Sequence, residues 1–170
     1  MLDHFRTFAA YNRWANLRLY EAAGTMSEED FHRDCSVAFH SMHGTLNHIL
    51  VGDAIWLARF QQSPPPPHKL DTILAETLDE LGELRSQADS RIIQFVDGLD
   101  MDQINAAFTY APVTLPEPVT LQLGPALAHL FNHQTHHRGQ AHAILTRLTG
   151  KAPPLDLIYF QLENRSAKSA

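Results

Sequence analysis

Apolar residues recur every three or four positions along four long segments of this chain, and this spacing constrains the fold more than any other feature. The segments are 3–23, 41–61, 71–97 and 122–148. Each predicts an amphipathic helix of roughly 30–40 Å, at about 1.5 Å per residue. Four consecutive prolines follow the second segment, and a proline run cannot continue a helix. Helices of this length are typical of a four-helix bundle, so we expect an all-α fold of this class.

Shorter elements are predicted in the connections. Residues 27–30 form a capping-box pattern that opens one turn of helix ending at Arg33. Residues 106–121 are rich in Thr, Val and Pro and predict an extended connection with room for a short hairpin. The length of this connection leads us to expect a long crossover between the third and fourth long helices. Residues 155–163 predict a short closing helix.

Composition excludes several classes of protein. A chain of 170 residues is the size of one domain, which we expect over 1–165, with a frayed tail over 166–170. The net charge of −6 argues against a nucleic-acid partner. No apolar run reaches the length of a membrane span, and charges interrupt any N-terminal signal, so we expect a cytoplasmic protein without membrane association. A single cysteine, Cys35, excludes a disulfide framework and a Cys-rich zinc site.

Ten of the eleven histidines gather in two stretches, five between positions 32 and 68 and five between 129 and 142. His133 and His137 lie four residues apart on a predicted helix, so both rings can reach one metal ion. Gln134 stands where the zinc-protease helix motif has its glutamate, which excludes that motif. The two stretches predict two elements that meet in space around a metal.

Spacing alone leaves the set of ligands open. His129 also lies four residues before His133, and His136 lies three after it, whereas His142 points to the opposite side of the helix. A third ligand must come from the other stretch, which offers His40, His43 and His48. His48 lies among small and apolar residues, where a buried imidazole needs a partner. The competing interpretation is that these histidines are ordinary buried residues and bind no metal.

Four stretches together resemble the DinB family, which comprises damage-inducible, YfiT-like metal-dependent proteins. They are YNRWANLRLY at 11–20, SMHGTLNHILVGDAIWLARF at 41–60, HLFNHQTHHRGQAHAIL at 129–145 and PPLDLIYF at 153–160. They follow the order expected of the family and span nearly the whole chain. The resemblance implies an up-down-down-up four-helix bundle that is usually a homodimer. It does not imply nucleic-acid chemistry, because the family name refers to induction by DNA damage.

The resemblance also implies a ligand set. The family takes one histidine from its second long helix and two from an H-x-x-H-H motif on its last long helix. In this chain these positions are His48, His133 and His137, which we expect to bind one zinc or nickel ion. His136 is then expected to face away from the ion, and His129 to lie behind the ligands. Asn12, Tyr11 and Asp53 are further candidates to line the pocket.

The function implied by the resemblance is that of a metal-dependent enzyme. Relatives include thiol-dependent S-transferases, in which the ion activates a small thiol such as bacillithiol, mycothiol or glutathione. One alternative is a metal-dependent hydrolase, for which the sequence offers no obvious general base. Another alternative is a non-catalytic dimer that binds a metal or ligand in a stress response. No single residue is identified as catalytic by these patterns.

Overall fold

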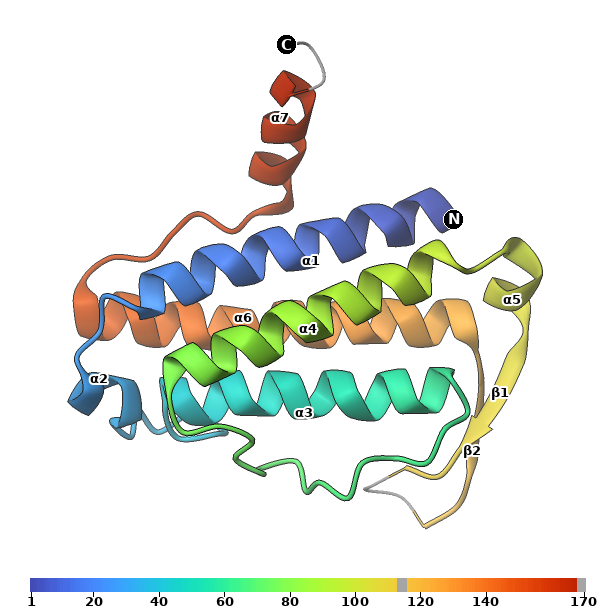
Figure 1. The fold of residues 1–170 in the computed structure, drawn as a ribbon, viewed down its shortest axis with the longest axis horizontal. Coiled ribbons are helices and arrows are strands. Elements are labelled where there is room, and N and C mark those ends of the chain that lie inside the picture. Colours follow the sequence, from blue (N-terminus) through green and yellow to red (C-terminus); the bar gives the residue numbers. More distant parts are fainter. Residues whose placement is uncertain (113–115, 168–170) are drawn as a thin grey trace.

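Four long helices lie side by side in the computed structural model, which describes residues 1–112 and 116–167 (Figure 1). They are α1 (Leu2–Ala23), α3 (Met42–Phe60), α4 (Leu78–Asp97) and α6 (Leu123–Thr149). Helix α1 packs against α4 and α6, and α3 packs against the same two helices. Helices α1 and α6 run in one direction, and α3 and α4 run in the other (Figure 1). The predicted helical class is therefore confirmed, although a small sheet is also present.

Smaller elements occupy the connections and the C-terminal end. They are α2 (Glu28–His32), α5 (Met101–Asn105), β1 (Ala107–Tyr110), β2 (Val119–Gln122) and α7 (Leu157–Ala167). Strands β1 and β2 form an antiparallel hairpin in the segment for which the sequence predicts an extended connection. Helix α7 includes residues 166 and 167, and residues 168–170 lie outside the described residues. No described helix is both long and apolar enough to cross a membrane.

Helix α4 begins seven residues later than the predicted 71–97, at Leu78. Thr77 and Glu80 form a capping box there, which satisfies backbone donors of the first turn. The preceding segment is held on α3 instead, because the Asn47 Oδ1 accepts hydrogen bonds from the backbone N–H groups of Leu74 (2.7 Å) and Ala75 (3.2 Å). The buried Asn47 side chain therefore binds two backbone N–H groups that the longer predicted helix would have included.

The long crossover also lies elsewhere than predicted. Residues 61–77 run back along the molecule between α3 and α4, whereas the described residues between α4 and α6, 98–112 and 116–122, stay at one end (Figure 1). The prolines at 64–67 favour an extended chain of about 3.1 Å per residue, which suits a segment that must span the length of a helix. The connection from α4 to α6 is shortened by α5 and the hairpin. The expected crossover between the third and fourth long helices is therefore wrong.

The interior consists of two apolar clusters with a buried polar layer between them. Leu127 and Leu130 belong to the first cluster, and Leu46 and Ile144 to the second. All four long helices contribute to the polar layer, whose members are Asn12, Asn16, Asp53, Arg85, Asp89, Gln134 and Arg138. Each of these side chains is at least 97% buried within the fold, so each needs a polar partner.

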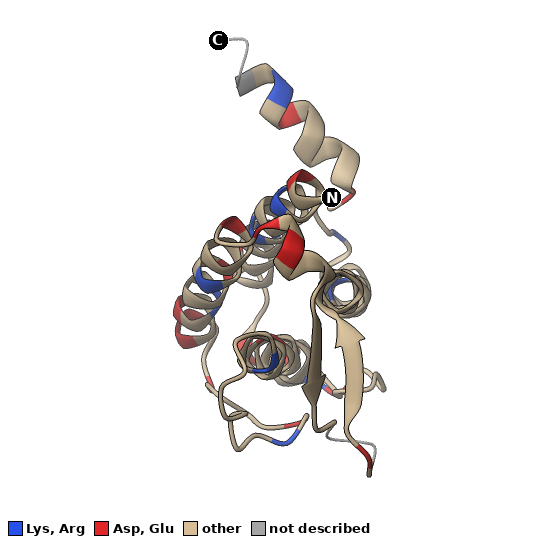
Figure 2. Ribbon diagram, turned by 90° about the vertical axis from the view of Figure 1, so that its right-hand side faces the viewer, with Lys and Arg blue, Asp and Glu red and all other residues tan. Residues whose placement is uncertain are grey.

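Helix α7 projects from the four long helices (Figures 1 and 2). Glu163 fastens it to α1, because its carboxylate accepts a hydrogen bond from the Trp14 Nε1 at 2.8 Å and pairs with Arg18 at 2.5 Å. Ile158 and Leu162 on the same helix remain 53% and 50% exposed. The projecting helix therefore carries apolar surface that this chain alone does not cover.

Candidate metal centre

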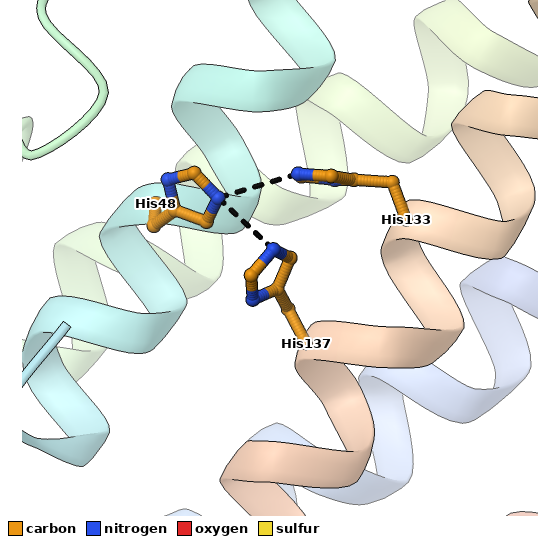
Figure 3. A group of neighbouring side chains, drawn as sticks. All are labelled: His48, His133 and His137. Carbon is orange, nitrogen blue, oxygen red and sulfur yellow. Dashed lines mark hydrogen bonds between the residues drawn. The ribbon is translucent and has the colours of Figure 1, made fainter. Parts of the chain in front are cut away.

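Three imidazole rings converge between α3 and α6 (Figure 3). The His48 Nε2 lies 3.3 Å from the His133 Nε2 and 3.2 Å from the His137 Nε2. Gly52 makes room for this arrangement, since a Cβ atom there would lie 2.8 Å from the His133 Cε1. The structure thus brings together the three histidines predicted as ligands, here called the three-histidine site.

The hydrogen bonds behind two of these rings determine where their protons lie. The His48 Nδ1 is 2.8 Å from the Leu70 carbonyl oxygen, which can only accept, so this nitrogen carries the proton. The His137 Nδ1 donates in the same way to the Gln140 Oε1 at 2.8 Å. Their Nε2 atoms therefore present lone pairs to each other across 3.2 Å. Two acceptors at this distance repel each other unless a cation lies between them.

Electrostatics keep the three rings neutral. Burial, together with the neighbouring His137, lowers the pKa of His48 to about 4, although the hydrogen bond to the Leu70 carbonyl opposes this shift. Burial, followed by the neighbouring imidazoles, lowers the pKa of His133 to about 3. The pKa of His137 is also lowered, mainly by burial. At neutral pH each ring is therefore uncharged and lacks the second proton, which would compete with a metal for the free ring nitrogen.

The donor set and its spacing fit a late divalent metal. Zinc–nitrogen bonds of about 2.05 Å at the tetrahedral angle place two ligand nitrogens about 3.3 Å apart. The nitrogen–nitrogen distances of 3.2 and 3.3 Å from His48 to His137 and His133 agree with this geometry. Three neutral ligands leave a fourth position open, which is the pattern of catalytic rather than structural zinc sites. The three-histidine site could therefore hold one metal ion together with an exchangeable ligand.

Phe39 covers one side of the site, which the sequence reasoning missed. Its ring stacks on His48 with 3.5 Å between centroids and 13° between planes. A tight turn brings it there, with positive φ angles at Ser36 (57°) and His40 (64°). Gly44 permits the turn, because a Cβ atom at that position would collide with the Phe39 carbonyl group. In the sequence, Gly44 is the signal that two backbone segments approach closely here. It does not indicate that the Phe39 ring stacks on His48 as a result.

The other histidines of α6 lie outside the three-histidine site. The ring of His129 packs against Trp56, with 4.8 Å between centroids. His136 is exposed, and its Nε2 lies 3.3 Å from the Gln140 side-chain nitrogen. His142 faces the C-terminal segment, where its Nε2 donates to the Pro153 carbonyl oxygen at 3.0 Å. Spacing alone did not decide which histidines of this helix face the other stretch. In the structure it is His133 and His137 that face His48.

A second group of potential ligands consists of His32, His43 and Glu76. The His43 Nε2 is the nitrogen that faces Glu76, at 3.7 Å, yet it donates to the Ala75 carbonyl oxygen at 2.9 Å. This ring therefore helps to fasten the segment before α4 onto α3. His40, the remaining candidate of this stretch, is exposed and belongs to neither group.

The three residues expected to line the pocket lie elsewhere. Asn12 and Asp53 belong to the buried polar layer, and the Tyr11 hydroxyl donates to the Leu155 carbonyl oxygen at 2.7 Å. Within residues 1–112 and 116–167, none of the three forms a hydrogen bond or ion pair with the three-histidine site. This expectation was wrong because neighbouring positions on a helix face different directions, so Asp53 points away from the side that Gly52 presents to His133.

Comparisons with known proteins identify the family and agree with the fold. The model of the DinB family matches residues 1–167. Protein DinB of Bacillus subtilis (strain 168) is 22% identical over 171 residues, which cover 94% of each chain. A solved structure of a conserved protein from Enterococcus faecalis superposes with a TM-score of 0.65 at 15% identity, covering 85% of this chain and 96% of that one. A DinB-like protein from Bacillus cereus ATCC 10987 gives 0.63 at 15% identity, covering 85% and 91%.

Proposed function

This chain belongs to the DinB family, and we propose that it is a metal-dependent thiol S-transferase whose zinc or nickel ion is held by His48, His133 and His137. The observation that carries the proposal is the pair of facing lone pairs on His48 and His137, 3.2 Å apart with no proton between them. Such a pair is costly in a buried site and becomes favourable around a cation. An exchangeable fourth position on that cation would accept a thiol.

Each residue of the site has a separate task in this proposal. The Leu70 carbonyl and the Gln140 amide hold the rings of His48 and His137 with their Nε2 atoms inward. Phe39 shields one side of His48 from water. These three rings would hold the divalent ion, which would lower the pKa of a bound thiol and so make thiolate available at neutral pH. The thiol proton passes to solvent, sulfur bonds to an electrophilic carbon, and the leaving group departs with the electron pair.

Hydrolysis is less well supported than thiol transfer. Zinc proteases that present two histidines on one helix activate the metal-bound water with a nearby glutamate as general base. Within the described parts of the chain, no carboxylate forms a hydrogen bond or ion pair with the three rings. Asp53, the nearest acidic residue along α3, is committed to Arg85 at 2.6 Å. A thiol brings its own nucleophile and needs no such base.

The proposal is tested by supplying cobalt or nickel to the apoprotein and adding glutathione, bacillithiol or mycothiol. A thiolate bound to either metal gives a charge-transfer absorption band. We expect such a band with at least one thiol, and metal-dependent conjugation of that thiol to monobromobimane. The band and the conjugation should both be lost in His133→Ala and kept in His4→Ala, which removes an exposed imidazole outside the site. Metal-loaded protein that gives neither a band nor conjugation with any of these thiols contradicts the proposal.

We also propose that the chain forms the homodimer, and the long helices the up-down-down-up four-helix bundle, that are typical of the family. The exposed Ile158, Tyr159 and Leu162 of α7 support a dimer, because a second copy would remove this apolar surface from water. Light scattering on wild type and Leu162→Glu would measure the change in mass. A cytoplasmic location suits a protein that uses small thiols, since these are kept reduced there.

A further inference from the structure

Beyond the three-histidine site, the same side of α3 carries an arginine held between two aromatic rings. The guanidinium carbon of Arg59 lies 4.6 Å from the centre of the Trp56 ring and 4.4 Å from that of Tyr110 on β1. Contacts of this kind attract the cation to both ring faces. A half-buried arginine is therefore fixed in place while its N–H groups remain available at the edge of the planar guanidinium.

A continuous row of rings connects this arginine to the three-histidine site. The ring of His133 lies 6.0 Å from that of His129, and His129 lies 4.8 Å from Trp56. Along α3, seven residues separate Gly52, beside His133, from Arg59. At about 1.5 Å per residue the two positions are about 10 Å apart. A molecule of tripeptide size could span that distance.

Arg59 has no anionic partner among the described residues. Arg6, Arg18, Arg33 and Arg85 each pair with a carboxylate within 4.0 Å, whereas no carboxylate of residues 1–112 or 116–167 lies within that distance of Arg59. Strands β1 and β2 contain no charged residue and are drawn without charge colours in Figure 2. Three neutral histidine ligands would also leave a divalent ion with its full charge. Arg59 therefore carries a positive charge that no described carboxylate within 4.0 Å compensates.

We propose that Arg59, clamped by Trp56 and Tyr110, binds a carboxylate of the substrate whose sulfur reacts at the three-histidine site. A guanidinium binds a carboxylate through two parallel hydrogen bonds, and its fixed position selects where that carboxylate lies. The substrate class is thus an anionic thiol with a carboxylate about 10 Å from its sulfur. The proposal that the substrate's sulfur reacts at the three-histidine site rests on the proposed function. The proposal that Arg59 binds a carboxylate, here called the carboxylate site, does not.

The test separates the carboxylate from the thiol with three probes. Glutathione has both groups, S-methylglutathione keeps the carboxylates without a free thiol, and glutathione diethyl ester keeps the thiol without the carboxylates. Binding to zinc-supplied protein is followed by the indole N–H signal of Trp56 in nitrogen-15 spectra, assigned with Trp14→Phe. We expect glutathione to bind about tenfold more tightly than its diester, because charged hydrogen bonds are lost in the ester. S-methylglutathione should also shift the Trp56 signal.

Variants assign the preference to Arg59. In Arg59→Gln, glutathione and its diester should bind within about twofold of each other, and Arg59→Lys should keep part of the preference. Arg91→Gln, which removes one charge from the exposed side of α4, should behave as wild type. Equal binding of glutathione and diester to wild type, an unchanged ratio in Arg59→Gln, or no shift with S-methylglutathione overturns the carboxylate site. A Trp56 shift with S-methylglutathione, without a thiolate band for any thiol, supports the carboxylate site and contradicts the proposed function.

Discussion

Helices α3 and α6 each contribute to two polar clusters of opposite character. On one side, His48, His133 and His137 form the three-histidine site. On the other side, Asp53 and Gln134 join the buried polar layer, although they are direct neighbours of Gly52 and His133 in the sequence. Both clusters are thus built on these two helices, and they differ in whether the protein supplies groups of opposite charge: the aspartates of the polar layer face Arg85, whereas the ring nitrogens of the three-histidine site face one another. That difference separates a structural cluster from a binding site.

The charged groups of the polar layer are paired with one another within the chain. Arg85 pairs with Asp53 at 2.6 Å and with Asp89 at 3.0 Å. The Asn16 side chain donates to Asp89 at 3.0 Å, and Arg138 donates to Asn16 at 3.3 Å. Two arginines and two aspartates balance in charge, and all four long helices are joined by these contacts. This cluster specifies how the helices pack and has no open position for a ligand.

The three-histidine site is not satisfied within the chain. The lone pairs of His48 and His137 face each other, and the buried His133 Nδ1 has no hydrogen-bond partner. An arrangement with unpaired buried nitrogens is stabilised only by something that binds to it. The polar layer should therefore control stability, and the three-histidine site should control metal binding.

The largest expected effect is on stability, from removal of Arg85. Arg85→Leu leaves Asp53 and Asp89 buried without a counter-charge, so the free energy of unfolding should fall by about 3–5 kcal/mol. Urea denaturation of the metal-free protein measures this change. Arg91→Leu, on the exposed side of the same helix, is the matched control and should change it by less than about 0.5 kcal/mol. Equal stability of the two variants would contradict the role given to the polar layer.

Two glycine substitutions separate metal binding from stability. In Gly52→Ala the new Cβ would lie 2.8 Å from the His133 Cε1, so the ring must shift from its position. Strain of about 1–3 kcal/mol would weaken zinc binding by roughly five- to 150-fold. Gly139→Ala, where no atom lies within 4 Å of the added carbon, should leave zinc affinity unchanged and stabilise α6 slightly. Competition with a chromogenic chelator measures both affinities, and equal values would show that Gly52 does not position His133.

Gln140 allows a further test of the three-histidine site, because it acts on that site through its hydrogen bond with His137. Gln140→Leu removes the acceptor that holds the His137 Nδ1–H, so zinc affinity should fall by about 10–100-fold. Gln140→Glu keeps an acceptor and should retain most of the affinity. The same chelator competition measures both variants. An unchanged affinity in Gln140→Leu would mean that the ring of His137 is oriented by packing alone.

The metal-free protein should also show a pH dependence of its stability. Unfolded histidine has a pKa of about 6.5, whereas the folded values are about 4 for His48 and about 3 for His133. Between these values the unfolded chain binds more protons, so stability should fall as the pH is lowered from about 6.5 towards 4. Thermal melts of wild type and His133→Gln measure this effect, and the variant should lose less stability. Parallel pH profiles would contradict the neutral state assigned to His133.

Local patterns were sufficient to predict the helices but not all of their ends. The periodicity of apolar residues predicts α1, α3 and α6 closely, because each buries one continuous face. The start of α4 was predicted too early, since residues 71–77 also carry helical spacing, and it is Asn47 and His43, on another helix, that hold this segment in a different structure. Such a contact between distant segments leaves no periodic signal in either one.

The candidate site was predictable in part for the same reason. The spacing of His133 and His137 marks one face of a helix, and the resemblance to the DinB family, which the family match confirms, supplied His48. Phe39 and the Leu70 carbonyl could not be predicted, because a turn and a loop bring them to His48. Asp53 was misplaced because its charge suggested a functional role, whereas Arg85 satisfies that charge in the interior.

The most direct test of the central claim is the metal content of protein purified without a histidine tag or nickel resin. Elemental analysis should find about one zinc or nickel ion per chain in wild type and in His4→Ala. His48→Ala and His133→Ala should contain almost none, while circular dichroism shows unchanged helix content. Folded wild-type protein that contains no metal and takes up neither added zinc nor added nickel would contradict the account. The three histidines would then be buried residues of the helix interface.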